Sequence, residues 1–93
     1  MARQRYVIPS RDIVIIVLRE MAKMATESTM SFTKAEFIKT YWRLRKQRKI
    51  PFVKIETLLR TLRQMAAESS FLKYKTYGSK KGGKYILDVI ALP

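Results

Sequence analysis

The spacing of the apolar residues changes once along this chain, and that change limits the folds that the chain can form. Up to about residue 70, apolar residues recur every three to four positions, which is typical of helices with one buried face. We predict helices at about 11–26, 33–47 and 52–68. Beyond this point apolar and polar residues alternate, which predicts two strands at 71–77 and 84–92 around a glycine-containing loop.

A two-stranded hairpin is only marginally stable alone, so we expect it to pack on the helices. Residues 30–32 are a candidate third strand. The expected fold class is therefore α+β, with three helices followed by a two-stranded hairpin.

Local signals set the ends of these helices. Thr33 and Glu36 have the spacing of a capping box, and Phe32 and Phe37 have that of a hydrophobic staple. Ser10 is the expected N-cap of the first helix. Pro51 forces a break before the third helix, because the residue before a proline avoids helical geometry.

Composition excludes most catalytic functions. The 93 residues include no Cys, no His and only seven Asp and Glu. Disulfides, thiolate metal sites and the usual general base near neutral pH are therefore absent. We expect one domain, with a basic arm at 1–9 and a core at about 10–92, and no enzyme activity, metal or cofactor.

The net charge of +13 predicts a polyanionic partner, either a nucleic acid or an anionic membrane surface. The longest apolar run, 13–18, has six residues, far short of the roughly 20 that span a bilayer. No segment has the features of a signal peptide, and none has the amphipathic pattern of a membrane-surface helix. We therefore expect a cytoplasmic protein without a membrane partner. The absence of Asn and Cys is typical of proteins from thermophiles.

The order of helix, short strand, helix, helix and basic hairpin resembles that of winged helix-turn-helix proteins, of the small basic type found in archaea and their viruses. The resemblance covers about 10–92 and rests on element order and charge placement. It implies that the third helix enters the DNA major groove and that the hairpin, the wing at 77–84, contacts the backbone or the minor groove. The link at 47–51 departs from the family pattern, because it is long and lacks glycine.

The resemblance also assigns site residues. The groove-facing set on the third helix is Lys54, Thr57, Arg60, Thr61 and Gln64. The expected wing contacts are Lys73, Lys75, Tyr77, Ser79, Lys80, Lys81 and Lys84. Two acid-free windows, 39–49 and 71–87, hold 11 of the 20 basic residues. The first of them supplies the expected phosphate contacts Arg43, Arg45, Lys46, Arg48 and Lys49.

Other apolar and aromatic residues have mainly structural interpretations. We expect Tyr74 and Tyr85 to pair across the hairpin, and Trp42, Phe37, Phe52 and the methionines to lie in the core. The run 13–18 cannot all face one small core from a surface helix. Either this helix is central, or a second subunit covers it, which predicts a homodimer through Ile13, Ile16 and Val17.

Three functions fit this pattern. The first is a sequence-reading double-stranded DNA-binding protein that regulates transcription. The second is an RNA-binding winged-helix component of a ribonucleoprotein. The third is an architectural protein that binds DNA without sequence preference, which would suit the excess of charge over base-reading groups.

Overall fold

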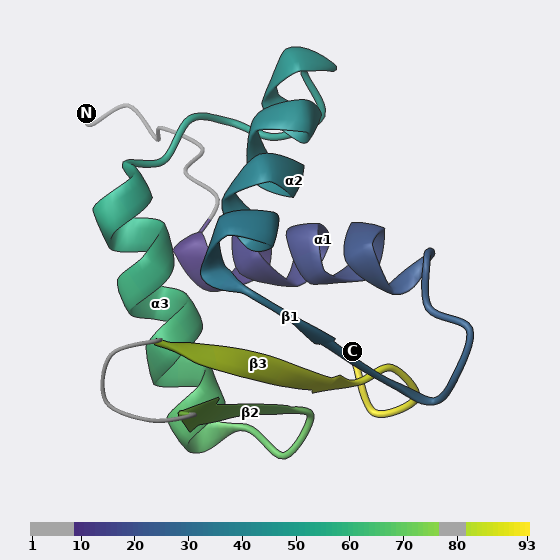
Figure 1. Ribbon diagram of the computed structural model, residues 1–93. Coiled ribbons are helices and arrows are strands. Elements are labelled where there is room, and N and C mark those ends of the chain that lie inside the picture. Colours follow the sequence, from purple (N-terminus) through teal and green to yellow (C-terminus); the bar gives the residue numbers. More distant parts are fainter. Residues whose placement is uncertain (1–8, 77–81) are drawn as a thin grey trace, which may run out of the picture.

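The computed structural model describes residues 9–76 and 82–93 as three helices and a three-stranded antiparallel sheet (Figure 1). The elements, in chain order, are α1 (Ser10–Ala22), β1 (Thr29–Phe32), α2 (Lys34–Lys46), α3 (Ile55–Glu68), β2 (Leu72–Thr76) and β3 (Gly83–Asp88). The predicted order of elements and the α+β class are confirmed, and this arrangement is compatible with a winged helix. The predicted third strand at 30–32 is also confirmed, as β1.

The sheet has the order β1-β3-β2, so the last strand of the chain lies between the other two. Tyr85 of β3 pairs with Phe32 on one side and with Tyr74 on the other. Their rings form a row across the face of the sheet that packs toward the helices, with centroid separations of 5.4 and 4.7 Å. The predicted pairing of Tyr74 with Tyr85 is confirmed.

Helix α1 is central to the core and packs against both other helices. Ile13, Val14, Val17 and Leu18 are fully buried by the rest of the same chain, while Ile16 is half-buried. The central-helix alternative is therefore the correct one. Ile13 and Val17 cannot form the predicted dimer interface, and the apolar content of α1 no longer requires a second subunit.

The predicted N-cap of α1 is also wrong. Pro9 occupies the cap position without a side-chain cap bond, and Ser10 is the first helical residue. The Ser10 hydroxyl instead lies 3.1 Å from the hydroxyl of Thr61, so it joins the start of α1 to α3.

The start of α2 follows the prediction closely. The Glu36 amide donates to the Thr33 hydroxyl at 3.2 Å, and the Thr33 amide donates to the Glu36 carboxylate at 2.7 Å, which completes the capping box. Phe32 and Phe37 stack with centroids 6.1 Å apart, as expected of the hydrophobic staple. This local motif fixes the direction in which the chain passes from β1 into α2.

The link between α2 and α3 is longer than predicted. Helix α2 ends at Lys46, and Arg48 beyond it lies in the left-handed region at φ 58°, while the Lys49 amide donates to the Leu44 carbonyl at 3.0 Å. This is the bond pattern of a Schellman motif, in which glycine usually takes the position that Arg48 has here. Lys54 remains extended, so α3 begins at Ile55 rather than near residue 52.

A buried tyrosine holds this link in place. The Tyr41 hydroxyl donates to the Val53 carbonyl at 3.0 Å and accepts from the Val53 amide at 2.7 Å. Both backbone groups of Val53 are therefore bonded outside any helix, two residues before α3 starts.

Several predictions for the core were wrong. Trp42 is 45% exposed, Phe52 is 59% exposed and Met24 is 76% exposed. Phe37, Met21 and Met65 are buried as expected. Strand β3 also ends earlier than predicted, at Asp88, whose carboxylate accepts bonds from the amides of the next turn at 3.1 and 3.3 Å.

Candidate nucleic-acid interface

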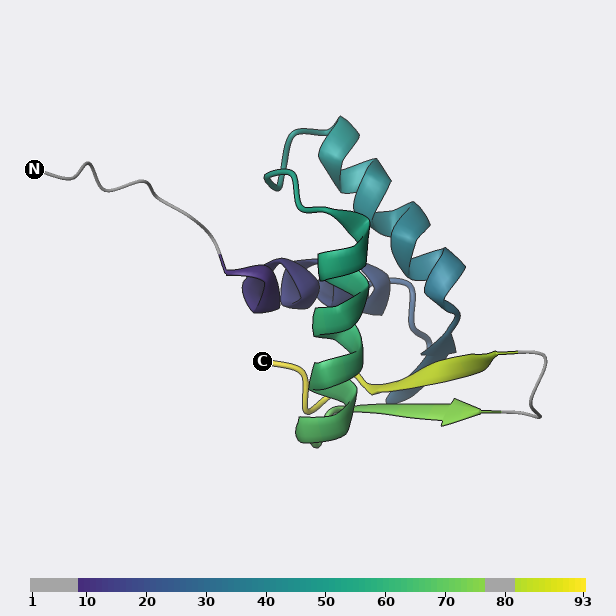
Figure 2. The ribbon, with the colours of Figure 1, turned by 90° about the vertical axis from the view of Figure 1, so that its left-hand side faces the viewer.

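The outward face of α3 is a continuous polar surface. Leu58, Leu62 and Met65 are buried against the core. The exposed residues on the opposite side are Glu56, Arg60, Arg63, Gln64 and Ala67. Their spacing is that of one helical face. In Figure 2, α3 lies in front with its length uncovered, the link to α2 above it and the hairpin to its lower right.

The structure corrects the predicted set of groove-facing residues. Arg60 and Gln64 lie on the outward face, but Thr61 is only 8% exposed and its hydroxyl donates to the Thr57 carbonyl at 2.9 Å. Thr57 is half-buried, and Lys54 is exposed but precedes the helix.

The predicted face is turned by roughly 70° from the observed one. The reason is that the start of α1 covers one flank of α3. Ser10 contacts Thr61 there, and Arg11 forms an ion pair of 3.2 Å with Glu68.

Arg63 is a residue that the sequence prediction missed. It is exposed on the outward face of α3, and its guanidinium lies 4.9 Å from the centre of the Tyr74 ring. The signal was present in the sequence, because residues three apart share a helix face and Arg60 had been assigned to that face. Arg63 thus joins the surface of α3 to that of the hairpin.

A shallow hollow lies where α3 meets the start of α2 and β3. It is lined by Lys34, Leu59, Arg60, Arg63, Gln64 and Tyr85. Three of these side chains are cationic and none is a carboxylate. Lys34 was not predicted to belong to this site, because only the tertiary fold brings the start of α2 beside α3.

The hairpin contributes cations on the other face of the sheet. Lys73, Lys75 and Lys84 are exposed and alternate with the residues that face the helices. Lys75 and Lys84 are direct partners across the strands, an arrangement of like charges that costs stability unless an anion lies nearby. The fold therefore does not gather these lysines with Arg60 and Arg63. The other predicted wing residues, Tyr77, Ser79, Lys80 and Lys81, lie outside the described residues.

The predicted phosphate contacts at the end of α2 differ in their availability. Arg45 is half-buried, donates to the Ile50 carbonyl at 3.1 Å and lies 5.6 Å from the centre of the Phe52 ring. One of its guanidinium bonds therefore goes to the α2–α3 link, and its contact with a phosphate stays a prediction. Arg43 is exposed but forms an ion pair of 3.2 Å with Glu20.

The remaining three cations of this stretch are exposed. They are Lys46, Arg48 and Lys49. Arg48 and Lys49 border a second hollow with Ile50 and Pro51, on the link that leads into α3. Exposed cations therefore lie on the link before the N-terminal end of α3, and Lys34 lies beside its outward face.

Two ionisable groups have shifted pKa values. Burial raises the pKa of the Tyr85 phenol, while the nearby Arg63 guanidinium acts in the opposite direction. A hydrogen bond from Lys23 lowers the pKa of Glu20, and burial opposes this effect. Neither group has the surroundings of a catalytic acid or base, since Tyr85 packs in the aromatic row and Glu20 is ion-paired.

The α3 surface therefore presents positive charges and hydrogen-bond donors to a partner. Within residues 9–76 and 82–93, no group of three or more Asp and Glu side chains could hold a metal ion. Among the same residues, no helix is both long and apolar enough to cross a bilayer.

Comparison of the chain with protein-family models, curated proteins and solved structures gave no match.

Proposed function

We propose that this chain is a winged-helix protein that binds double-stranded DNA, reads its sequence with α3 and regulates transcription. The observation that carries the proposal is the uncovered face of α3, on which Arg60, Arg63 and Gln64 are exposed, with further cations beside it and on the preceding link. An α-helix fits the major groove, where arginine can donate two bonds to guanine and glutamine can bond adenine.

The cations around α3 would contact the DNA backbone. Arg48 and Lys49 lie on the link before the helix, and Lys34 lies beside Arg60 and Arg63. Contacts of this kind position a protein on the duplex and make binding depend on salt, without reading sequence. Glu56, at the first turn of the same outward face, is unfavourable near phosphates, because its carboxylate is repelled by them.

A selection of binding sites from random duplex DNA tests this proposal. A regulator would yield a consensus sequence, whereas an architectural protein would yield none. Competition among the selected duplex, single-stranded DNA and structured RNA then separates DNA binding from RNA binding. Preferential displacement by structured RNA would overturn the proposal in favour of a ribonucleoprotein component.

Two substitutions distinguish residues that read the base sequence from residues that contact only the DNA backbone. Arg60→Ala should reduce discrimination between the selected and random duplexes by about 1–3 kcal/mol. Lys34→Ala should instead weaken binding to all duplexes alike and lower the salt slope by about one. The assignment of roles would be reversed if Lys34→Ala changed the preferred sequence while Arg60→Ala weakened every duplex equally.

A further inference from the structure

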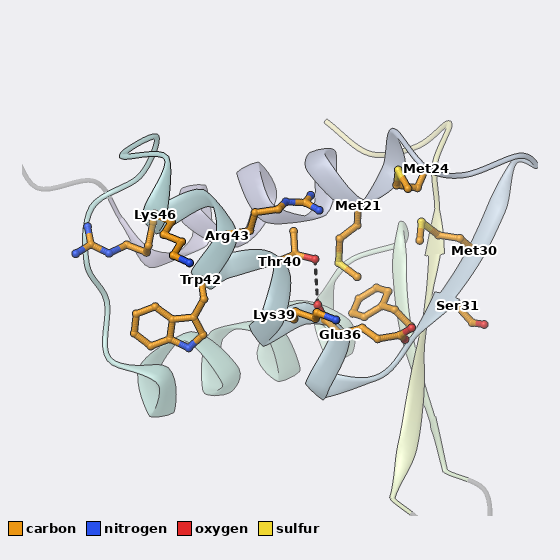
Figure 3. A pocket seen from close by; sticks show the side chains of 12 residues that line it. Met21, Met24, Met30, Ser31, Glu36, Lys39, Thr40, Trp42, Arg43 and Lys46 are labelled. Carbon is orange, nitrogen blue, oxygen red and sulfur yellow. Dashed lines mark hydrogen bonds between the residues drawn. The ribbon is translucent and has the colours of Figure 1, made fainter.

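A groove on another part of the surface is lined by methionines and cations. It lies between the C-terminal end of α1, β1 and the exposed side of α2 (Figure 3). Met21, Met24 and Met30 gather at one end of it, and Trp42 lies near the other. Figure 1 shows α3 at the left of the molecule and the C-terminal end of α1 at the right, so this groove is separate from the outward face of α3.

Three apolar residues of this groove are open to solvent, while Met21 and Phe32, which also line it, are buried. Met24 is the most exposed methionine of the described residues, and Met30 is half-buried. Trp42 is also exposed, although a tryptophan buries a large area when it finds a partner. Methionine side chains adapt their shape readily and recur on surfaces that receive partner helices. These residues have the character of an unoccupied contact surface.

The wall formed by α2 is basic. Lys39, Arg43 and Lys46 are exposed along one stripe of the helix, at spacings of four and three residues. Glu36 is the one carboxylate among the lining residues, and it is engaged in the capping box at the start of α2. Within residues 9–76 and 82–93, Lys39 and Lys46 have no ion-pair partner, whereas Arg43 pairs with Glu20. The groove therefore favours an anionic occupant.

We propose that this groove binds an acidic amphipathic helix of a partner protein. Apolar side chains of the partner would cover Met24, Met30 and Trp42, and its carboxylates would face Lys39 and Lys46. These two lysines are seven residues apart on α2, or about 10 Å along the axis, so carboxylates two turns apart on the partner would match them. A second copy of this chain is a poor occupant, because its net charge of +13 would add repulsion.

NMR spectra of the full chain, recorded while a designed peptide is added, test this proposal. The probe is a helical peptide of roughly 16 residues with leucines on one face and glutamates flanking them. A peptide of the same composition, scrambled to remove the apolar face, is the control. We expect shifts of the Met21, Met24 and Met30 methyl signals and of the Lys39 and Lys46 amides with the first peptide only.

Matched variants distinguish binding of the peptide in the groove from its non-specific electrostatic attraction to a basic protein. Met24→Ser should weaken binding about tenfold, whereas Ile90→Ser, at a side chain that is 81% exposed elsewhere, should not change it. Lys46→Glu should likewise weaken binding about tenfold, and Lys73→Glu should have a smaller effect.

Three results would overturn the proposal. They are equal binding of the scrambled peptide, equal effects of the paired variants, and displacement of the peptide by duplex DNA. Displacement would mean that this groove belongs to the DNA surface. Met24→Ser should leave DNA binding unchanged, so failure of this proposal can be distinguished from failure of the proposed function.

Discussion

Removal of the Tyr41 hydroxyl should loosen the link into α3 while leaving the core intact. The ring of Tyr41 is fully buried, and phenylalanine can fill the same space. What is lost are the two hydrogen bonds to Val53, of 3.0 and 2.7 Å. Each is worth about 0.5–1.5 kcal/mol net, and the unpaired amide and carbonyl add a penalty wherever water cannot reach them.

The expected loss for Tyr41→Phe is about 2 kcal/mol in the free energy of unfolding, because Val53 is half-buried and water can reach part of it. In a domain of this size that loss lowers the melting temperature by about 8–16 °C. Urea denaturation followed by circular dichroism measures it, with an unchanged slope on denaturant if the folded state keeps its compactness.

Tyr74→Phe is the matched control. The Tyr74 hydroxyl makes no hydrogen bond within the described residues, and its ring is half-buried on the hairpin. We expect a change within about 0.5 kcal/mol for this variant. If Tyr41→Phe also cost less than 0.5 kcal/mol, the reasoning that this hydroxyl holds the link would be refuted.

Three further substitutions test local features. Arg48→Gly should stabilise the chain by about 0.5–1 kcal/mol in urea denaturation, because glycine adopts the φ of 58° without the strain of a side chain. Gly83→Ala should destabilise it by about 1–3 kcal/mol in the same assay, since the new Cβ would lie 2.5 Å from the Lys75 carbonyl oxygen and 2.6 Å from the Tyr74 ring. Tyr85→Phe should reduce the loss of stability above pH 10. Burial raises the pKa of the Tyr85 phenol above its ordinary 10.0. The stability that the neutral phenol contributes is therefore lost as the pH rises through the raised pKa, and phenylalanine has no proton to lose.

Each of these three predictions has a result that would contradict it. A destabilised Arg48→Gly would mean that the Arg48 side chain contributes more than its backbone strain costs. An unchanged Gly83→Ala would mean that the hairpin strands can separate freely at this position. Equal alkaline unfolding of wild type and Tyr85→Phe, measured at several pH values, would show that other groups carry the alkaline transition.

Features encoded by near neighbours in the sequence could be predicted. The capping box at Thr33 and Glu36 and the staple of Phe32 on Phe37 depend on residues three to five positions apart, so their pattern is visible in the sequence. The alternation of the two strands similarly predicted the pairing of Tyr74 with Tyr85.

Features set by distant contacts could not be predicted in the same way. Thr61 looks like a surface residue until Ser10, 51 positions away, is packed beside it. The start of α3 depends on the bonds between Tyr41 and Val53, which the helical pattern of α3 does not encode. Trp42 was predicted to lie in the core, but the core side of α2 is taken by Phe37, Tyr41 and Leu44.

Binding of duplex DNA by the outward face of α3 can be tested by the affinity of a double variant. Arg60→Ala with Arg63→Ala removes two cations from that face. Arg19→Ala with Lys23→Ala removes two exposed cations from α1 and its C-cap and serves as the control. Circular dichroism should first establish that both variants are folded.

Fluorescence anisotropy with the selected duplex, at fixed salt, then gives the dissociation constants. We expect the α3 variant to lose at least about 30-fold in affinity, or about 2 kcal/mol, while the α1 variant changes by only a few-fold. Equal losses for the two variants would show that DNA is held by net charge and not by this face of α3.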